Sequence, residues 1–161
     1  MVPQSGLNFE APITRLEWQA AGTFANAPFR QFELRFCHTS VAELTADLNT
    51  NYGGNTPVLV HSANPLLLTG QSDNWFGFDL TTTFDYNNRD NLIIETRWNN
   101  GTVETACDTW GWGTGKNWGW ISKQYGGESG QLFAVICRFR VTYDDQAVAP
   151  TSLGRVRALY R

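Results

Sequence analysis

The segment from Asn74 to Trp98, NWFGFDLTTTFDYNNRDNLIIETRW, constrains the fold most because its side chains alternate in character. Its first half has apolar residues at every second position, the period of a half-buried β-strand: Phe76, Phe78 and Leu80. A cluster of turn-forming residues follows at positions 86–90. These features predict a strand that ends in a polar turn.

The second half of this segment, NLIIETRW, shows the same alternation with a sharper contrast between the two faces. Ile94, Thr96 and Trp98 share one face of the expected strand, and Glu95 and Arg97 share the other. The whole segment therefore predicts two strands joined by a turn, which is scaffold rather than chemistry.

Most of the remaining chain has the same short-period pattern, interrupted by glycine, proline and asparagine. The further strands that we expect are Leu7–Trp18, Phe29–His38, Thr56–His61, Thr102–Trp112, Asn117–Tyr125, Gln131–Tyr143 and Leu153–Arg161. The two strands 102–112 and 117–125 are expected to form a hairpin around residues 113–116. The strand 131–143 is expected to be the longest, with one apolar face made of Phe133, Val135, Cys137, Phe139 and Val141.

A single helix is expected at Ser40–Asn49, where Ser40 can serve as the N-cap and Glu43 completes a capping box. About eight or nine strands at short spacing with one short helix predict an all-β fold. Within that class we expect an antiparallel β-sandwich, either jelly-roll or immunoglobulin-like.

The length of 161 residues suits one domain, and a second core is not expected. We expect a sandwich at residues 1–143, followed at 144–161 by a linker and a C-terminal strand. A net charge of −3 offers no basic surface for nucleic acid, and no apolar run is long enough to span a membrane. The light charge and the abundance of Thr, Asn, Gly and Trp favour an extracellular or cell-surface location, and Asn100 begins a glycosylation sequon.

The three cysteines leave one thiol unpaired if any disulfide forms. A Cys107–Cys137 bridge and buried free thiols are both open, and Cys37 is expected on the face of Glu33 and Arg35. The chain has no CxxC pattern, so we expect no structural zinc site. Oxygen ligands for calcium could come from Asp85, Asn87, Asn88 and Asp90, but turn-forming chemistry accounts for these residues. We therefore expect no metal and no cofactor.

Candidate catalytic residues do not converge in the sequence, and we do not expect an enzyme. His38 and His61 are far apart along the chain, and no serine lies in a nucleophile-elbow motif. Glu95 and Asp79 could meet as a carboxylate pair for glycoside hydrolysis, although solvated strand faces explain them more simply.

The most unusual local feature is a group of four tryptophans spaced in pairs with glycine between them, at Trp110, Trp112, Trp118 and Trp120. If they share a face, they make an aromatic platform that could stack on the sugar rings of a glycan. The alternative is that the indoles cover the core or a neighbouring subunit, since tryptophan is enriched in subunit interfaces.

Two stretches read together, FELRFCHTSVAELTADLNTNYGGNTPVLVHSA and NWFGFDLTTTFDYNNRDNLIIETRW, carry a family resemblance. Residues 7–98 resemble a β-sandwich module of large secreted and surface proteins of bacteria and archaea. The resemblance implies a repeated extracellular structural or adhesive unit; such modules have no established enzymatic activity, and the resemblance supplies no catalytic residues.

The ends of the chain suggest how such a unit could assemble with copies of itself. The C-terminal strand could be donated to a neighbour through Leu153, Arg155, Val156, Arg157, Ala158, Leu159, Tyr160 and Arg161. The accepting edge is expected near Val2, Leu7 and Phe9. A tandem array, and a C-terminal strand that completes its own sandwich, are the alternatives. We therefore expect a structural subunit of a filament or surface assembly, with a carbohydrate-binding or adhesive module as the alternative function.

Overall fold

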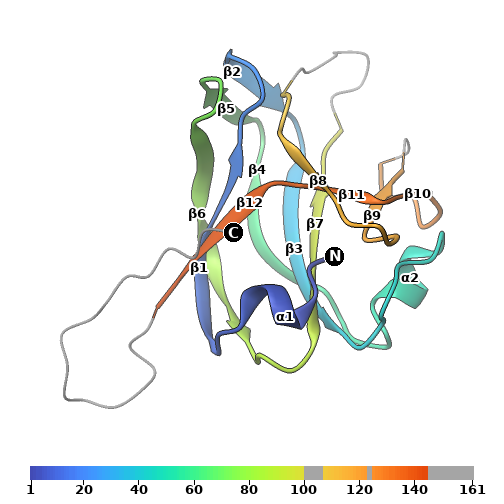
Figure 1. Ribbon diagram of the computed structural model, residues 1–161. Coiled ribbons are helices and arrows are strands. Elements are labelled where there is room, and N and C mark those ends of the chain that lie inside the picture. The colour runs from blue at the N-terminus through green and yellow to red at the C-terminus, as the bar shows by residue number, and fades with distance from the viewer. Residues whose placement is uncertain (100–106, 123–124, 145–161) are drawn as a thin grey trace, which may run out of the picture.

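The computed structural model describes residues 1–99, 107–122 and 125–144, and most of its regular structure is antiparallel β-strand. The strands of the main body are β1 (Ala11–Gln19), β3 (Phe32–Thr39), β4 (Val58–Ala63), β6 (Trp75–Tyr86), β7 (Asn91–Arg97) and β12 (Phe139–Tyr143). They form one sheet with the order β12–β1–β6 and a second with the order β4–β3–β7 (Figure 1). The predicted all-β, antiparallel, sandwich-like fold is confirmed.

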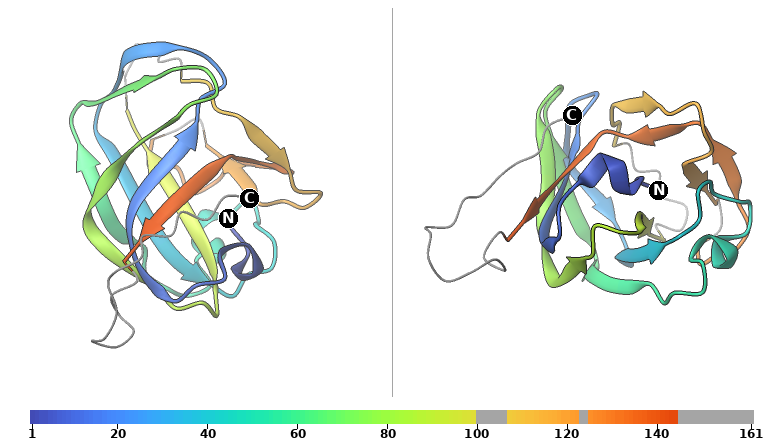
Figure 2. Two further views of the ribbon diagram at one scale, coloured as in Figure 1. Left: turned by 60° about the vertical axis from the view of Figure 1, so that its left-hand side comes forward. Right: turned by 60° about the horizontal axis from the view of Figure 1, so that its bottom comes forward.

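The shorter elements lie around this body. Strand β2 (Phe24–Phe29) pairs with β5 (Leu66–Gly70) at one end. Four three-residue strands form what we call the side lobe: β8 (Gly111–Gly113), β9 (Gly119–Ile121), β10 (Gln131–Phe133) and β11 (Val135–Cys137). The one-turn helices are α1 (Gln4–Leu7) and α2 (Leu48–Asn51). Figure 2 shows the side lobe and α2 together on one side of the body.

The main core, here the inner cluster, lies between the two three-stranded sheets. Leu34 and Phe36 of β3 are fully buried in it. The ring of Phe36 meets that of Phe84 edge-on at 5.5 Å, which joins β3 to β6 across the sandwich. Residues of one face of β7 enter the same cluster, because Ile94 pairs with Phe36 in the β3–β7 register. The alternation predicted for β7 is therefore confirmed.

A smaller buried cluster covers the opposite face of β3 and β7. This outer cluster consists of Met1, Cys37, Leu44, Leu48, Tyr52 and Ile93, with Trp118, Trp120 and Leu132 packed against it. Its members come from the first residue of the chain, from the two strands, from α2 and the residues on either side of it, and from the side lobe and its loops. The expectation that the chain would form one core alone is therefore wrong: the β3–β7 sheet is covered on both faces.

The predicted helix at Ser40–Asn49 is wrong, because α2 begins only at Leu48. Its N-cap is Asp47, whose side chain accepts hydrogen bonds from the backbone N–H groups of Asn49 and Thr50 at 2.8 and 3.3 Å. The backbone N–H groups of Leu44 and Leu48 instead donate to the carbonyls of Asn117 and Glu128, which lie in the loops that precede β9 and β10 of the side lobe. These tertiary bonds outcompete a short helix, which has little stability of its own. The sequence also missed α1, so the described chain has two short helices rather than one.

The hairpin predicted between strands 102–112 and 117–125 is also wrong. Strand β8 pairs with β11 and strand β9 with β10, so the two halves of the expected hairpin have different partners. The predicted long strand 131–143 divides into β10, β11 and β12, and the longest strand is β6 with 12 residues.

The apolar face predicted for residues 131–143 is inverted over its first half. Phe133 and Val135 are 39% and 51% exposed, whereas Leu132 and Ile136 are half-buried. Only from β12 onward does the predicted face turn inward, at the buried Val141. Both faces of this stretch are apolar, so alternation alone could not decide which face packs inward.

Candidate functional site

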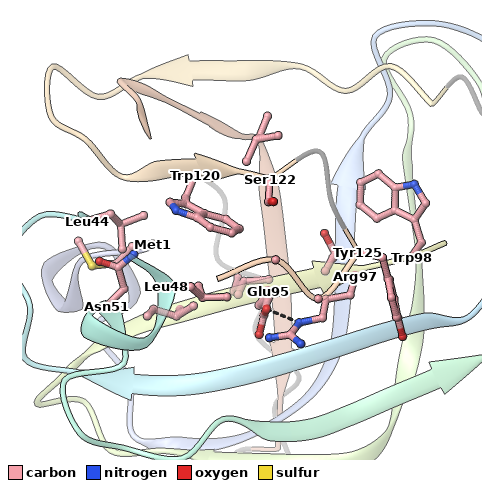
Figure 3. Close-up of a pocket in the computed structure, with 16 residues that line it drawn as sticks. Met1, Leu44, Leu48, Asn51, Glu95, Arg97, Trp98, Trp120, Ser122 and Tyr125 are labelled. Carbon is pink, nitrogen blue, oxygen red and sulfur yellow. Dashed lines mark hydrogen bonds and ion pairs between the residues drawn. The ribbon is translucent and has the colours of Figure 1, made fainter. Parts of the chain in front are cut away.

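A cavity of about 720 Å³ lies between the outer face of β7, helix α2 and the side lobe (Figure 3). Six consecutive residues, 93–98, line one of its walls. Leu44, Leu48 and Trp120 contribute apolar surface, and Ser122 and Tyr125 lie on the side-lobe wall. The volume is typical of a site for a small ligand or for a short peptide segment.

A buried carboxylate lies on the β7 wall of this cavity. Glu95 is 8% exposed, accepts a hydrogen bond from the Tyr52 hydroxyl at 2.8 Å and pairs with the Arg97 Nε. Burial, followed by the nearby Glu95 carboxylate, raises the pKa of Tyr52 to about 12, so Tyr52 keeps its proton and remains a donor. Both oxygens of Glu95 are engaged, which makes the cluster a satisfied polar network rather than a free general base.

A repeated Glu-x-Arg pattern in the sequence produces this arrangement. Glu33 and Arg35 of β3 stand directly opposite Arg97 and Glu95 of β7, so charges of opposite sign alternate across the two strands. Arg35 also pairs with Glu33 along β3 at 2.9 Å. This Glu-x-Arg repeat is the sequence signal that could have identified the polar wall of the cavity.

Aromatic side chains mark the opposite end of the cavity from Met1 (Figure 3). Trp98 and Tyr125 are 46% and 44% exposed, and Trp120 is half-buried with its Nε1 donating to the Ala46 carbonyl at 3.1 Å. At the other end the amino group of Met1 donates to the Trp118 carbonyl at 2.5 Å, and burial lowers its pKa to about 5. The cavity thus runs from a buried, apolar end to an exposed, aromatic one.

The free side of β7 runs along this cavity. On one side β7 pairs with β3, and on the other the backbone of Leu92 exchanges two hydrogen bonds with Val2, at 2.7 and 2.9 Å. In an antiparallel strand every second residue directs its N–H and C=O to the same side, so Ile94 and Thr96 present theirs as Leu92 does. Among the described residues, no further backbone segment bonds to Ile94 or Thr96 there. With respect to the residues that the structure describes, this stretch of β7 is therefore an open edge.

The four tryptophans proposed as a platform occupy two different environments. Trp110 and Trp112 both lie near the Arg138 guanidinium, whose carbon is 5.8 and 5.6 Å from their ring centroids. Trp118 and Trp120 pack against the outer cluster. Within the described chain no ring contact joins any two of the four, and of these indoles only Trp120 lines the cavity.

The residues expected to form an accepting edge belong to the protein's own interior. Val2, Leu7 and Phe9 are 6%, 5% and 8% exposed and are part of the inner cluster. The Phe9 ring stacks on Tyr143 with centroids 4.1 Å apart. The expected assembly strand at 153–161 and the sequon at Asn100 lie outside the described residues.

The side chains considered for catalysis are separated. Asp79, on β6, pairs with Arg15 at 2.9 Å, whereas Glu95 lies in the other three-stranded sheet. His38 accepts a hydrogen bond from the Asn87 backbone, and the ring of His61 packs on Phe78 at 4.3 Å. Burial lowers the pKa of both histidines. The structure therefore does not bring these groups together.

The three cysteines are free thiols. Cys37 lies on the face of Glu33 and Arg35, as predicted, and burial raises its pKa to about 11. Burial also raises the pKa of Cys107 to about 11. In the part of the chain that the structure describes, no three histidine, cysteine or acidic side chains are grouped to hold a metal ion.

The described residues contain no helix that is both long and apolar enough to cross a membrane. No protein-family model, no curated protein and no solved structure matches this chain at a level that would indicate common ancestry.

Proposed function

We propose that the protein is a non-enzymatic structural subunit of an extracellular filament or cell-surface assembly, and that it joins copies of itself by strand pairing. The observation that carries the proposal is the open edge of β7 beside the cavity. An exposed strand edge is a template for another strand, and a neighbouring cavity can receive alternate side chains of that strand. The resemblance to repeated surface modules supports the same kind of role.

The composition of this edge also favours pairing. Natural edges are commonly protected by proline, lysine or a bulge, which discourage the approach of another chain. Along 93–98 the residues that direct their backbone groups outward are Ile94, Thr96 and Trp98, and none of them is charged. The stretch spans about 20 Å at the usual rise of a strand, which is enough for five or six paired residues.

Substitution of Thr96 by proline tests the proposal. The N–H of Thr96 points to the open edge, so proline removes a donor that an incoming strand needs and leaves the β3 ladder intact. We expect the unaltered chain to assemble as its concentration rises, and Thr96→Pro to remain monomeric. Thr96→Val, which keeps the N–H, is the matched control and should assemble normally.

Light scattering after size-exclusion chromatography and electron microscopy measure this outcome. Circular dichroism establishes that Thr96→Pro is folded, and Thr96→Lys places a charge at the same edge if proline disturbs the strand. An unaltered chain that stays monomeric at every concentration, or a folded Thr96→Pro that assembles like the control, contradicts the proposal.

A second candidate function, glycan binding, is supported by the aromatic end of the cavity. Trp98, Trp120 and Tyr125 could stack on sugar rings, with Arg97 and Ser122 supplying hydrogen bonds. We expect a bound glycan to change tryptophan fluorescence, and Trp98→Ala to abolish the change. A panel of glycans that causes no fluorescence change excludes this function. If the glycan and a neighbour's strand both occupy the cavity, assembly should reduce the fluorescence change.

A further inference from the structure

We infer that the open edge of β7 receives residues 153–161 of a second copy, running antiparallel to β7 and with an apolar face in the cavity. The inference rests on the proposed function, and it names the partner segment, its direction and the side chains that enter.

The direction follows from the contact that already exists on this edge. Val2 forms an antiparallel bridge with Leu92, and Met1, the neighbour of Val2, lines the cavity. Beyond Met1 the edge of β7 continues along Ile94, Thr96 and Trp98, which also line the cavity. An incoming strand that runs antiparallel to β7 therefore extends the pairing that Val2 begins, with the same hydrogen-bond alternation.

The chain contains one segment outside the described residues that suits this edge. Residues 153–161, LGRVRALYR, alternate between an apolar face, Val156, Ala158 and Tyr160, and a face that carries Arg155 and Arg157. Such alternation is what a strand needs when one of its faces is buried and the other is not.

A second copy is a better source of this segment than the same copy. Strand β12 leaves the side lobe and runs across the body away from the cavity (Figure 1), ending at Tyr143 on the far end of β1. Asp144 is held there by a hydrogen bond to the Pro12 carbonyl at 2.9 Å. The described part of the chain therefore ends away from its own β7 edge, which favours a second copy as the source of the segment.

The chemistry of the cavity decides which face of the segment enters. The cavity side of β7 has a carboxylate whose oxygens are already engaged by Tyr52 and Arg97, and apolar walls formed by Leu44, Leu48 and Trp120. An arginine entering here would be buried without a free counter-ion, which is costly. The apolar face therefore enters. The arginines lie on the side of Ile94 and Thr96, which are only half-buried.

Disulfide trapping between two differently labelled chains tests the inference, with Cys107 and Cys137 replaced by serine. One chain carries Thr96→Cys, and the other carries a single cysteine at a position from 155 to 159. Directly opposite residues of an antiparallel pair share a face, so we expect cross-links from Arg155→Cys and Arg157→Cys and at least fivefold fewer from Val156→Cys and Ala158→Cys. Equal cross-linking at all positions overturns the assigned face and pairing.

Substitutions in the full-length chain separate this inference from the proposed function. We expect Ala158→Asp to raise the concentration needed for assembly at least tenfold, and its neighbour Arg157→Gln to leave it within twofold. If Thr96→Pro blocks assembly but Ala158→Asp does not, another segment pairs with β7: the inference is wrong and the proposed function stands. A chain that carries both Thr96→Cys and Arg157→Cys and cross-links only within itself also overturns the inference, since the tail then pairs with its own edge. A chain that never assembles overturns both.

Discussion

The two faces of the β4–β3–β7 sheet are covered in different ways, although the same strands supply both. The inner face packs on a second sheet, and Leu34 and Phe36 are completely buried there. The outer face is covered by α2, the segment before it and the side lobe, and it retains the polar network of Glu95 and a cavity of about 720 Å³. Two sheets fill the space between them through complementary alternation, whereas short, irregular segments leave room for an additional strand or ligand.

Truncation of one leucine on each side should give the largest effect and the most direct test of this contrast. Leu34→Ala removes a side chain with 0% exposure from the inner cluster, and we expect a loss of about 4 kcal/mol of stability. Leu48→Ala should cost only about 2 kcal/mol, because Leu48 already lines the cavity and its neighbours can relax. Urea unfolding of both variants measures the difference. Equal losses would show that the outer cluster packs as tightly as the inner one.

The next effect concerns the polar network of the outer face. Glu95→Ala leaves Tyr52 and Arg97 without their acceptor in a buried site, and we expect a loss of about 3 kcal/mol. Glu33→Ala is the matched control, because Glu33 has the same kind of arginine partner on the same face but a side chain that is 26% exposed. Its loss should be no more than about 1 kcal/mol.

Equal losses in the two glutamate variants would contradict the distinction between a buried and an exposed pair. Glu95→Gln sharpens the test further, because the amide keeps an acceptor for Tyr52 but loses the charge facing Arg97. Its stability should lie between those of the unaltered protein and Glu95→Ala.

Sequence patterns predicted the elements whose neighbours are themselves regular. The faces of β7 were correct because a strand beside a strand keeps a period of two, and Cys37 was placed correctly for the same reason. The helix expected at Ser40–Asn49 does not form because loops of the side lobe, distant in sequence, accept hydrogen bonds from the backbone N–H groups of Leu44 and Leu48. The inward face predicted for the first half of residues 131–143 was wrong because both faces of that stretch are apolar.

The cavity could not be predicted from the periodicity of any one segment, for a related reason. It exists only where β7, α2 and the side lobe meet, and no period within one segment encodes that meeting. What the sequence did contain was the pair of Glu-x-Arg triplets at 33–35 and 95–97, whose cross-strand register brings opposite charges together.

The outer cluster should also respond to pH through the amino group of Met1. This amine is buried, and its pKa falls from 8.0 in the unfolded chain to about 5 in the folded protein. Between these values the unfolded chain binds more protons, so stability is lost as the pH falls from 8 toward 5. We expect the free energy of unfolding to fall by about 1.4 kcal/mol between pH 7 and pH 6, as measured by urea unfolding at each pH.

Acetylation of the Met1 amine is the control for this pH dependence. Burial lowers the pKa of His38 and His61 as well, so both histidines add a slope of the same sign. Only the difference between the free and the acetylated chain therefore belongs to Met1. Identical slopes in the two chains would mean that the amine reaches water in the folded protein.

The smallest expected effect lies at the cap of α2, which holds Leu48 and Tyr52 over the outer face. Asp47→Ala removes the acceptor of two backbone N–H groups and should cost about 1 kcal/mol, whereas Asp47→Asn keeps an acceptor and should cost less. Since α2 forms no part of the inner cluster, hydrogen exchange should accelerate around α2 and stay unchanged at Leu34 and Phe36. Acceleration on both faces would mean that the outer cover and the sandwich unfold as one unit, and that the two faces differ in packing but not in cooperativity.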